Sequence, residues 1–358
     1  MNYRVNKFYA RTAHTADATV VIDLNMTDIV SNIMIQYSPQ NATAVNVGPA
    51  MAGITKVELI DGSDVLFSLT GLCTEALDWY CRGGNFNNNY NYILNGSGQD
   101  RNMSINFGRY LWDPDYAFDP KHFTNPQLRI SLDISAGGNT PTTVYLTCFA
   151  NMFDDLSVSP KGFLMSKEIK QWTATSAAHE YTDLPTDYPY RNIYLQARLA
   201  DTEAIQCVTN VKISEDNDKR IPFDLGQREL SRVSRGNYGK VEEHFYFGSD
   251  TSLKYIYCAA SDAVSAYGTS WADAAAELNL GFYGGDGGYL HVDGATAGGN
   301  IQVFVRGDTP HCVFQIPVGI QDAPETWWDV RNIGSLKADI TGGASAVCKL
   351  FMEQLRSY

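Results

Sequence analysis

The chain has 358 residues, more than twice the roughly 150 that fill an ordinary domain, so two domains are expected in place of one. Apolar residues make up 44% of the chain and charged residues only 19%, a balance that excludes a disordered or coiled-coil protein. The formal net charge of −13 excludes a protein that holds the nucleic-acid backbone with clustered cations, so no direct sequence-specific nucleic-acid binding is expected.

The first half of the chain has the pattern of a series of short strands. Apolar stretches separated by turn-forming residues predict about eight of them, at residues 19–24, 32–37, 55–60, 65–69, 90–94, 103–108, 128–134 and 143–150. Eight short strands of even spacing favour an all-β fold of the two-sheet jelly-roll type. A plain sandwich with other connections is the alternative.

A tight hairpin and a short helix stand in the middle of this series. Asp61 and Gly62 are expected to supply the positive φ angles of a two-residue hairpin loop. The helix predicted at residues 72–82 ends before Gly83, which suits the left-handed position after a helix. Its apolar residues recur at helical spacing, at Leu72, Ala76, Leu77 and Tyr80. We expect this stripe to pack against the strands of the same half.

A polar segment at residues 154–162, broken by Pro160 and Gly162, predicts the boundary between two domains. We therefore expect a first jelly roll over residues 1–158 and a second over residues 159–358. Because the linker is short, the two domains should lie tightly side by side.

The second half repeats the first in the same order. The stretch NIMIQ at 32–36 corresponds to NIYLQ at 192–196, an offset of 160 residues. Further pairs are the hairpin strands at 57–59 and 65–69 with 211–213 and 221–225, the stretch 104–108 with 315–319, and the final hairpin 128–146 with 336–350. Two domains of the same fold, each with a short flanking helix, follow from this repeat.

The second half also repeats the helix and then departs from the first half. A helix at 227–235 is predicted to end at Gly236, as the first helix ends at Gly83. Residues 248–300 have no counterpart, and their richness in Gly, Ala, Ser and Asp predicts an outward loop inserted in the second jelly roll. Within it we expect a short helix at 271–280 and an outer surface formed by 281–299.

The seven cysteines are odd in number and mostly embedded in apolar runs, which predicts reduced, buried thiols. A disulfide between Cys73 and Cys81 is disfavoured because a helix holds them two turns apart. No leader-like apolar run follows the N-terminal basic residues, and no stretch of 18 apolar residues occurs. We expect a chain that is neither secreted nor membrane-spanning.

No motif indicates catalysis, a cofactor or a metal site. Gly239 and Lys240 lack the first glycine of a phosphate loop, no GxSxG elbow occurs, and paired carboxylates cannot be judged from spacing alone. The six histidines are isolated from one another and are expected mostly in turns or at the surface: His14, His122, His179, His244, His291 and His311. We predict no catalytic residue, no cofactor and no bound metal.

Three local patterns are weaker candidates for a site. The glycine-rich run at 281–289 is favoured as an exposed loop over an anion cradle, because no clear strand and helix flank it. The acidic clusters at 113–115, 154–155 and 215–218 lack calcium-loop spacing and coincide with expected turns. One ring of the adjacent pair Trp327 and Trp328 is expected to face a neighbouring domain or subunit.

This arrangement resembles the double jelly-roll major capsid proteins of tailless icosahedral bacteriophages with an internal membrane, and more distantly those of adenovirus. The resemblance covers the whole chain. It is carried by residues 54–85, by the stretch FGRYLWDP at 107–114 leading to NPQL at 125–128, and by 184–185 through 192–195.

The resemblance implies a structural role without enzymatic activity. It implies a homotrimer whose six jelly rolls form a pseudo-hexameric capsomer, and an icosahedral shell tiled by such capsomers in the virion, with synthesis in the host cytoplasm. The implied partners are copies of the chain itself, neighbouring capsomers, a vertex protein and an internal membrane beneath the shell.

A second class of protein stays open at this point. Paired jelly rolls also resemble secreted amidases that remove glycans, or carbohydrate-binding proteins. Such proteins usually carry a signal peptide and disulfides, which this sequence does not indicate.

Overall fold

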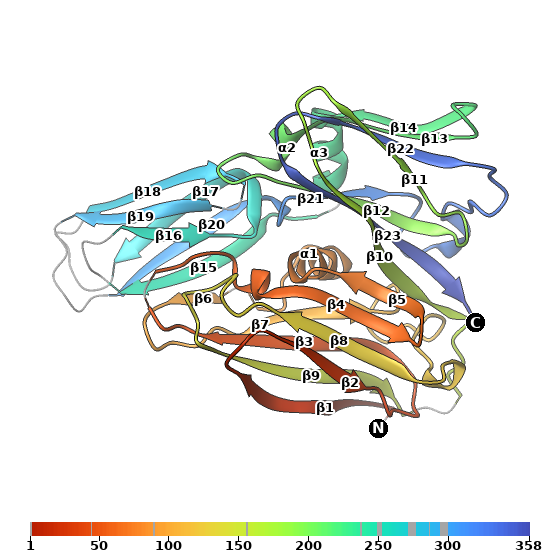
Figure 1. Ribbon diagram of the computed structural model, residues 1–358, viewed down its shortest axis with the longest axis horizontal. Coiled ribbons are helices and arrows are strands. Elements are labelled where there is room, and N and C mark those ends of the chain that lie inside the picture. The colour runs from red at the N-terminus through yellow and green to blue at the C-terminus, as the bar shows by residue number, and fades with distance from the viewer. Residues whose placement is uncertain are drawn as a thin grey trace.

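The structure of the chain is a computed structural model that describes residues 2–43, 45–88, 90–154, 157–236, 238–248, 253–270, 277–285, 287–293 and 300–358. Figure 1 shows three β-rich bodies: a first roll at the bottom, a second roll at the upper right and a lobe that extends to the left. The described helices are α1 (Gly71–Cys81), α2 (Ala204–Cys207) and α3 (Gln227–Gly236), with 3-10 turns η1 (Ala50–Gly53), η2 (Pro120–His122) and η3 (Pro324–Thr326). None of the described helices has the length and apolarity needed to cross a membrane.

The first roll consists of two sheets with four strands each. One sheet has the order β1-β9-β3-β7 and the other the order β2-β8-β4-β5, and neighbours pair antiparallel in both. This order is that of a jelly roll. The strands are β1 (Tyr3–His14), β2 (Ala18–Asp23), β3 (Val30–Gln40), β4 (Ile54–Asp61), β5 (Asp64–Leu69), β7 (Arg101–Asn106), β8 (Pro126–Leu132) and β9 (Thr143–Phe153).

The second roll has the same arrangement. Its sheets have the orders β10-β23-β12-β21 and β11-β22-β13-β14. The strands are β10 (Gly162–Thr173), β11 (His179–Asp183), β12 (Tyr190–Arg198), β13 (Val208–Glu215), β14 (Arg220–Gly226), β21 (Val313–Pro317), β22 (Leu336–Gly342) and β23 (Val347–Ser357). Strand by strand, β1 corresponds to β10, β3 to β12 and β9 to β23. The predicted fold class and the internal repeat are confirmed, since every predicted anchor pair lies on corresponding strands.

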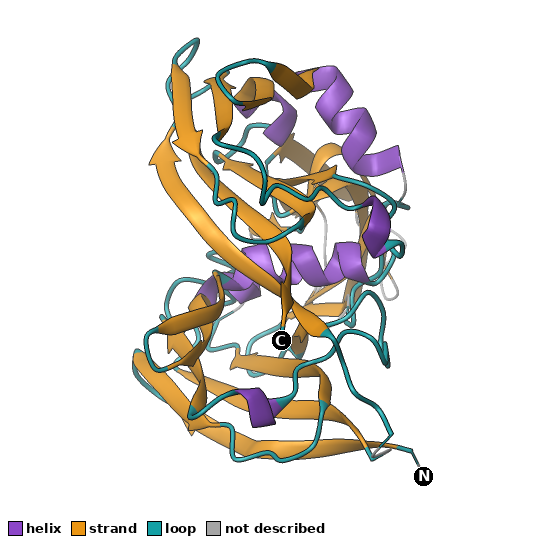
Figure 2. Cartoon of the chain, turned by 90° about the vertical axis from the view of Figure 1, so that its right-hand side faces the viewer, coloured by secondary structure: helices purple, strands orange, loops and turns teal. Residues whose placement is uncertain are grey.

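The two rolls are joined edge to edge. Strand β5 pairs in parallel with β10, through Phe67 with Ser166 and Ser68 with Lys167, so that one sheet of each roll becomes part of a single eight-stranded sheet. The second view shows the rolls above and below one another with α1 between them (Figure 2). The rolls lie side by side, as the short linker predicts.

Two strands of the first half differ from the prediction. Strand β1 was not among the eight predicted strands, although it forms an edge of the first roll. Strand β6 (Tyr90–Ile93) was counted as a strand of the roll, but it pairs in parallel with β15 (Val241–Gly248) of the lobe. The number of strands in the first roll is therefore eight, with β1 in place of β6.

Most of the described residues of the excursion at 248–300 form strands, so the prediction of an inserted loop was wrong for them. Its described residues build most of a two-sheet lobe with the orders β17-β20-β15-β6 and β16-β19-β18. The strands are β16 (Lys254–Tyr257), β17 (Ala260–Ser270), β18 (Glu277–Gly284), β19 (Gly287–Asp293) and β20 (Asn300–Pro310). Small residues do not prevent a strand when its partners supply the ladder hydrogen bonds.

The glycine-rich run within this lobe is a hairpin between β18 and β19, so its prediction as an exposed loop was also wrong. Gly287 and Gly288 are buried, and a Cβ at Gly288 would lie 2.5 Å from the carbonyl oxygen of Gly281. The glycine is needed for this close approach of two backbones. Of the predicted helix at 271–280, residues 277–280 belong to β18, and residues 271–276 lie outside the described part of the chain, as do 286 and 294–299.

The predicted positions of the two helices that follow the hairpins are confirmed, but only one of their ends has the expected geometry. Gly83 follows α1 with φ +68°, the left-handed conformation that glycine adopts without strain. Gly236 is instead the last residue of α3 and has no positive φ. In the first hairpin, Gly62 alone has a positive φ, because Asp61 still belongs to β4.

Two large hydrophobic cores, with a small third cluster around Phe153, hold these bodies together. The first roll and the lobe share one core, to which β15 contributes Phe245 and Phe247, and the second roll adds Tyr194 and Phe351 to it. The second roll has a core of its own around Ile193, Phe314 and Leu350. All seven cysteines are free thiols, and six are buried. The lobe is therefore anchored on the first roll, although most of its strands come from the second half of the chain.

Candidate functional site

Helix α1 is the element around which the two rolls and the lobe meet. Its first ten residues are all buried, and the Oγ1 atom of Thr70 caps its first turn by accepting a hydrogen bond from the amide of Cys73. Tyr80 Oη donates to the carbonyl of Val313 at 2.7 Å and lies 2.9 Å from Ser234 Oγ on α3. The helix thus packs on its own roll, as predicted, and also on the second roll, which the prediction missed.

Helix α3 is less buried than α1. Leu230 is fully buried in the core of the second roll, whereas Val233 is half-buried. The two helices occupy corresponding places in their rolls but not equal environments, because α1 is buried over ten residues, whereas α3 contacts the first half through Ser234 and is buried at fewer positions.

A buried charge network joins α1 to the lobe and to the second half. Arg101 on β7 donates from Nε to Glu75 at 3.0 Å and from NH1 to Glu243 at 2.9 Å. His311 Nε2 lies 2.8 Å from the second carboxylate oxygen of Glu75. All four side chains are at most 3% exposed. The network fixes β15 of the lobe and the turn at His311 to the first roll.

The carboxylate of Glu75 and the guanidinium of Arg101 both stay charged in this network. Burial by itself would raise the pKa of Glu75, but Arg101 and His311 more than offset it and hold that pKa below its usual value. Burial would lower the pKa of Arg101, and the carboxylates of Glu75 and Glu243 raise it above the ordinary value instead. His311 lies in a turn, as predicted for most of the histidines, but this turn is buried.

A second buried ion pair lies where the rolls touch. Arg191 NH1 and Glu353 Oε1 are 3.2 Å apart, and Asn192 donates to the other carboxylate oxygen at 2.7 Å. The guanidinium of Arg191 stacks on the ring of Trp327, which lies beside Tyr116 of the first half. The expectation that one ring of the tryptophan pair faces the neighbouring domain is confirmed.

Trp328 turns the other way. Its ring packs on Tyr190 and Phe223 of the second roll, and Nε1 donates to Glu215 at 3.1 Å. Neither tryptophan is on a strand, so their opposite directions come from the turn after η3 and not from strand alternation.

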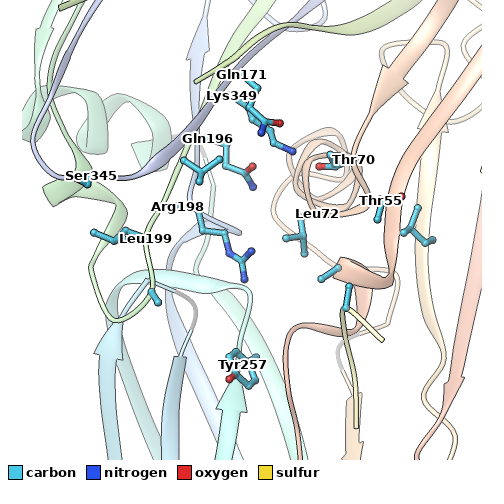
Figure 3. Close-up of a pocket in the computed structure, with 15 residues that line it drawn as sticks. Thr55, Thr70, Leu72, Gln171, Gln196, Arg198, Leu199, Tyr257, Ser345 and Lys349 are labelled. Carbon is cyan, nitrogen blue, oxygen red and sulfur yellow. The ribbon is translucent and has the colours of Figure 1, made fainter. Parts of the chain in front are cut away.

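A cavity of about 640 Å³ opens between the first roll, the second roll and the lobe. Figure 3 shows Thr55, Thr70 and Leu72 on one side of this cavity, facing Gln196, Arg198 and Lys349 on the other, with Tyr257 at the lobe. Among its lining residues, Arg198 and Lys349 carry the only charges, and no carboxylate, histidine or cysteine lines it.

The chemistry of this cavity does not support covalent catalysis. The thiol of Cys73 lies next to it, with Sγ 3.4 Å from Gln196 Oε1, but burial raises the pKa of Cys73 to about 11. A thiol that is protonated at neutral pH is a poor nucleophile. The lining residues supply neither a base nor a group to orient one. The cavity is best described as a gap between the rolls and the lobe, with a largely apolar lining and two cationic side chains.

The carboxylates of the acidic clusters pair with arginine side chains and backbone amides of the same chain. Asp113 is fully buried and accepts from Nε of Arg109 at 2.6 Å, and Asp115 accepts from the same guanidinium at 2.9 Å. Asp216 accepts from the backbone amides of Gly334 and Ser335. In the next cluster, Asp154 pairs with Arg4, while residue 155 lies outside the described residues. No group of three potential metal ligands occurs among the described residues.

Asp262 on β17 is the carboxylate with the most unusual environment at the base of the lobe. It accepts hydrogen bonds from the amide of Ile205 at 3.1 Å and from Thr309 Oγ1 at 2.5 Å, and it is 3% exposed. Burial, with the nearby charges of Glu203 and Asp308, raises the pKa of Asp262 to about 6. The ordinary pKa of an aspartate carboxyl, which applies to the unfolded chain, is 3.8.

We expect Asp262 to make the fold less stable as pH rises. Between about pH 4 and pH 6 the folded chain binds more protons than the unfolded chain at this residue, so the free energy of unfolding falls as pH rises, by about 3 kcal/mol from this group. Asp262→Asn should remove that part of the pH dependence while keeping an oxygen for Ile205. The measurement is the urea midpoint of both proteins at pH 4 and pH 7.

The exposed substitution Asp322→Asn serves as the matched control and should leave the wild-type pH profile unchanged. Parallel profiles of wild type and Asp262→Asn would show that Asp262 titrates normally.

No family model matches the chain, and no curated protein matches its sequence. Solved structures do resemble it along nearly its whole length. The crystal structure of the STIV MCP has a TM-score of 0.60 at 11% identity and covers 99% of this chain and 96% of that chain. The major capsid protein P2 from bacteriophage PM2 has a TM-score of 0.57 at 10% identity and covers 99% and 98%.

PBCV-1 VP54 gives a similar result, with a TM-score of 0.57 at 10% identity and coverage of 99% of this chain and 94% of that chain. All three are double jelly-roll major capsid proteins. At such low identity the similarity shows the fold. The chain has the double jelly-roll fold.

Proposed function

We propose that this chain, which has the fold of the double jelly-roll major capsid proteins, is itself a major capsid protein of an icosahedral virus. What supports this above all is the extent of the similarity, since it covers 94–98% of the three capsid proteins as well as 99% of this chain. The covered share of this chain includes both rolls and the lobe, so the likeness is not limited to one common domain.

The proposed assembly unit is a homotrimer. Two rolls with the same strand order lie side by side in each chain, so three chains supply six similar bodies for a pseudo-hexameric capsomer. The proposed division of the chain is a first roll over 1–158 and a second roll over 159–358 that carries the lobe. The proposed partners are other copies of the chain, neighbouring capsomers, a vertex protein and a membrane beneath the shell, and the proposed location is the capsid of the virion.

We infer that the role is structural and not enzymatic, without a catalytic, cofactor or metal site. The buried charge network at α1 connects the first roll to the lobe and to the second half of the chain. Such a network stabilises a rigid structural protein. The amidase alternative lacks any support in the chemistry of the described cavity.

Native mass measurement tests the trimer. The purified chain in mild buffer is expected to have three times the 39.6 kDa mass of one chain, and to assemble into larger particles when concentrated. A stable monomer or dimer over a wide concentration range would contradict the proposal.

A further inference from the structure

The outer face of the lobe carries a row of rings that crosses its whole four-stranded sheet. Tyr90 on β6, His244 on β15, Phe304 on β20 and Tyr267 on β17 stand directly opposite one another in register. Their ring centroids are 5.2, 4.4 and 4.7 Å apart in that order. We call these four residues the aromatic row.

A second pair of rings extends the row. Tyr92 and Tyr246, next along the same face of β6 and β15, stack at 5.0 Å with an angle of 19° between their planes. Tyr90 and Tyr92 are 44% and 40% exposed, and Tyr267 is 63% exposed. Large side chains this open to solvent, side by side on one sheet face, mark an interaction surface more often than a free one.

The rings of the row differ in orientation. Tyr267 and Phe304 are nearly parallel, and their spacing is close to the separation of about 4.8 Å between neighbouring strands. His244 is instead steeply inclined to both of its neighbours, with interplanar angles of 69° to Phe304 and 83° to Tyr90. Rings of mixed orientation do not form one flat stacking platform, and a protein surface can contact their edges, faces and hydroxyl groups.

A hollow of about 360 Å³ beside the row would receive an anchoring side chain of such a partner. Its lining includes Glu242, His244, Ser265, Tyr267, Phe304 and Arg306. Interfaces are rich in tyrosine and arginine, and their energy concentrates where one side chain fills a pocket of the other protein.

The charge of this face points to a second copy of the chain. Glu242 and Arg306 stand opposite each other and form an ion pair at 3.0 Å, so the outward residues that the structure describes are close to neutral together. The chain as a whole has a net charge of −13, which makes copies of it repel one another. A neutral, aromatic face is where two acidic copies can meet at the lowest electrostatic cost, whereas a cationic partner would favour an acidic face.

We propose that the aromatic row is a contact between copies of this chain, an inference that rests on the trimer proposed above. Of the six rings in the row and in the Tyr92–Tyr246 pair, three are 40–63% exposed and three are only partly exposed, so at about 200 Å² for each buried ring they offer roughly 400 Å². A stable interface takes about 800 Å² from each partner. The row therefore forms the centre of the contact, and surfaces next to it complete the area.

The test compares Tyr267→Glu with Tyr181→Glu. The two tyrosines are a matched pair, because both are 63% exposed, both lie on edge strands and both stack on one neighbouring ring. The full chain is diluted in series, and its mass is measured by light scattering and native mass spectrometry. Tyr267→Glu should raise the concentration at which half the trimer dissociates at least tenfold, and Tyr181→Glu should match wild type.

The thermal midpoints of the dissociated chains check that both variants fold, and Tyr267→Ser repeats the test without a new charge. A trimer as strong in both Tyr267 variants as in Tyr181→Glu would overturn the assignment of the row but leave the capsomer proposal standing. A wild-type chain that is monomeric at every concentration would overturn the capsomer proposal itself, so the two failures are distinguishable.

Discussion

Replacing Arg101 with methionine is expected to destabilise the folded chain by about 3–5 kcal/mol. The guanidinium neutralises Glu75 and Glu243, and the substitution leaves two carboxylates buried with too few donors. Methionine retains much of the side-chain volume, so the decrease in the free energy of unfolding measures the loss of the positive charge and not the creation of a cavity. The measurement is the urea denaturation midpoint together with its slope.

Arg331→Met is the matched control. Arg331 forms an ion pair with Asp329 at 2.7 Å, as short as those of the buried network, but both side chains are exposed. Water replaces such a partner easily, so no measurable change of the midpoint is expected. Equal midpoints for Arg101→Met and Arg331→Met would show that the buried network does not stabilise the fold.

Hydrogen exchange locates the effect of Arg101. Because Glu243 lies on β15 and Asn91 Nδ2 donates to it from β6, loss of Arg101 should speed amide exchange in β6 and β15 first. Exchange that rises only in β7 would contradict the role of the network in holding the lobe.

Replacing Leu77 with aspartate is expected to cost about 4 kcal/mol or more. Leu77 is 3% exposed on α1, within the core that the first roll shares with the lobe. A carboxylate there has to be buried without a partner or has to force α1 away from the rolls. Thermal unfolding and trimer formation are the measurements.

Leu111→Asp provides the control, since Leu111 is 49% exposed and its aspartate would remain in water. Unchanged melting and assembly of Leu77→Asp would show that the stripe of α1 is exposed, and would contradict both the packing of this helix and the equivalence of the two halves at this point.

Local patterns were sufficient for the elements that carry their own signals. The helices at 72–82 and 227–235 combine helical spacing with residues that end a helix, and the final hairpins combine alternation with glycine pairs. Such signals depend on neighbours within a few residues. They could be predicted without knowing the partner of any strand.

The missed strand β1 and the misassigned strand β6 lack such signals. Strand β1 is a half-exposed edge strand whose apolar residues are interrupted by charged ones, and it becomes a strand through its pairing with β9. Strand β6 was predicted as a strand, but its partner β15 lies about 150 residues away in the sequence. No local pattern contains a pairing over that distance.

The candidate site can be divided in the same way, into features that local patterns predict and features that depend on distant partners. The sequence by itself determined the two rolls, their internal repeat, the hairpin helices and the absence of a recognisable catalytic motif, because these depend on residue type and spacing along the chain. Only the tertiary structure decided that Glu75, Arg101, Glu243 and His311 form one buried network and that Tyr90, His244, Phe304 and Tyr267 form one row. Both sets draw on three or more segments that lie far apart in the sequence. The free energy gained when such segments pair and are buried depends on how the whole chain packs, and the spacing of residues along the chain does not encode that packing.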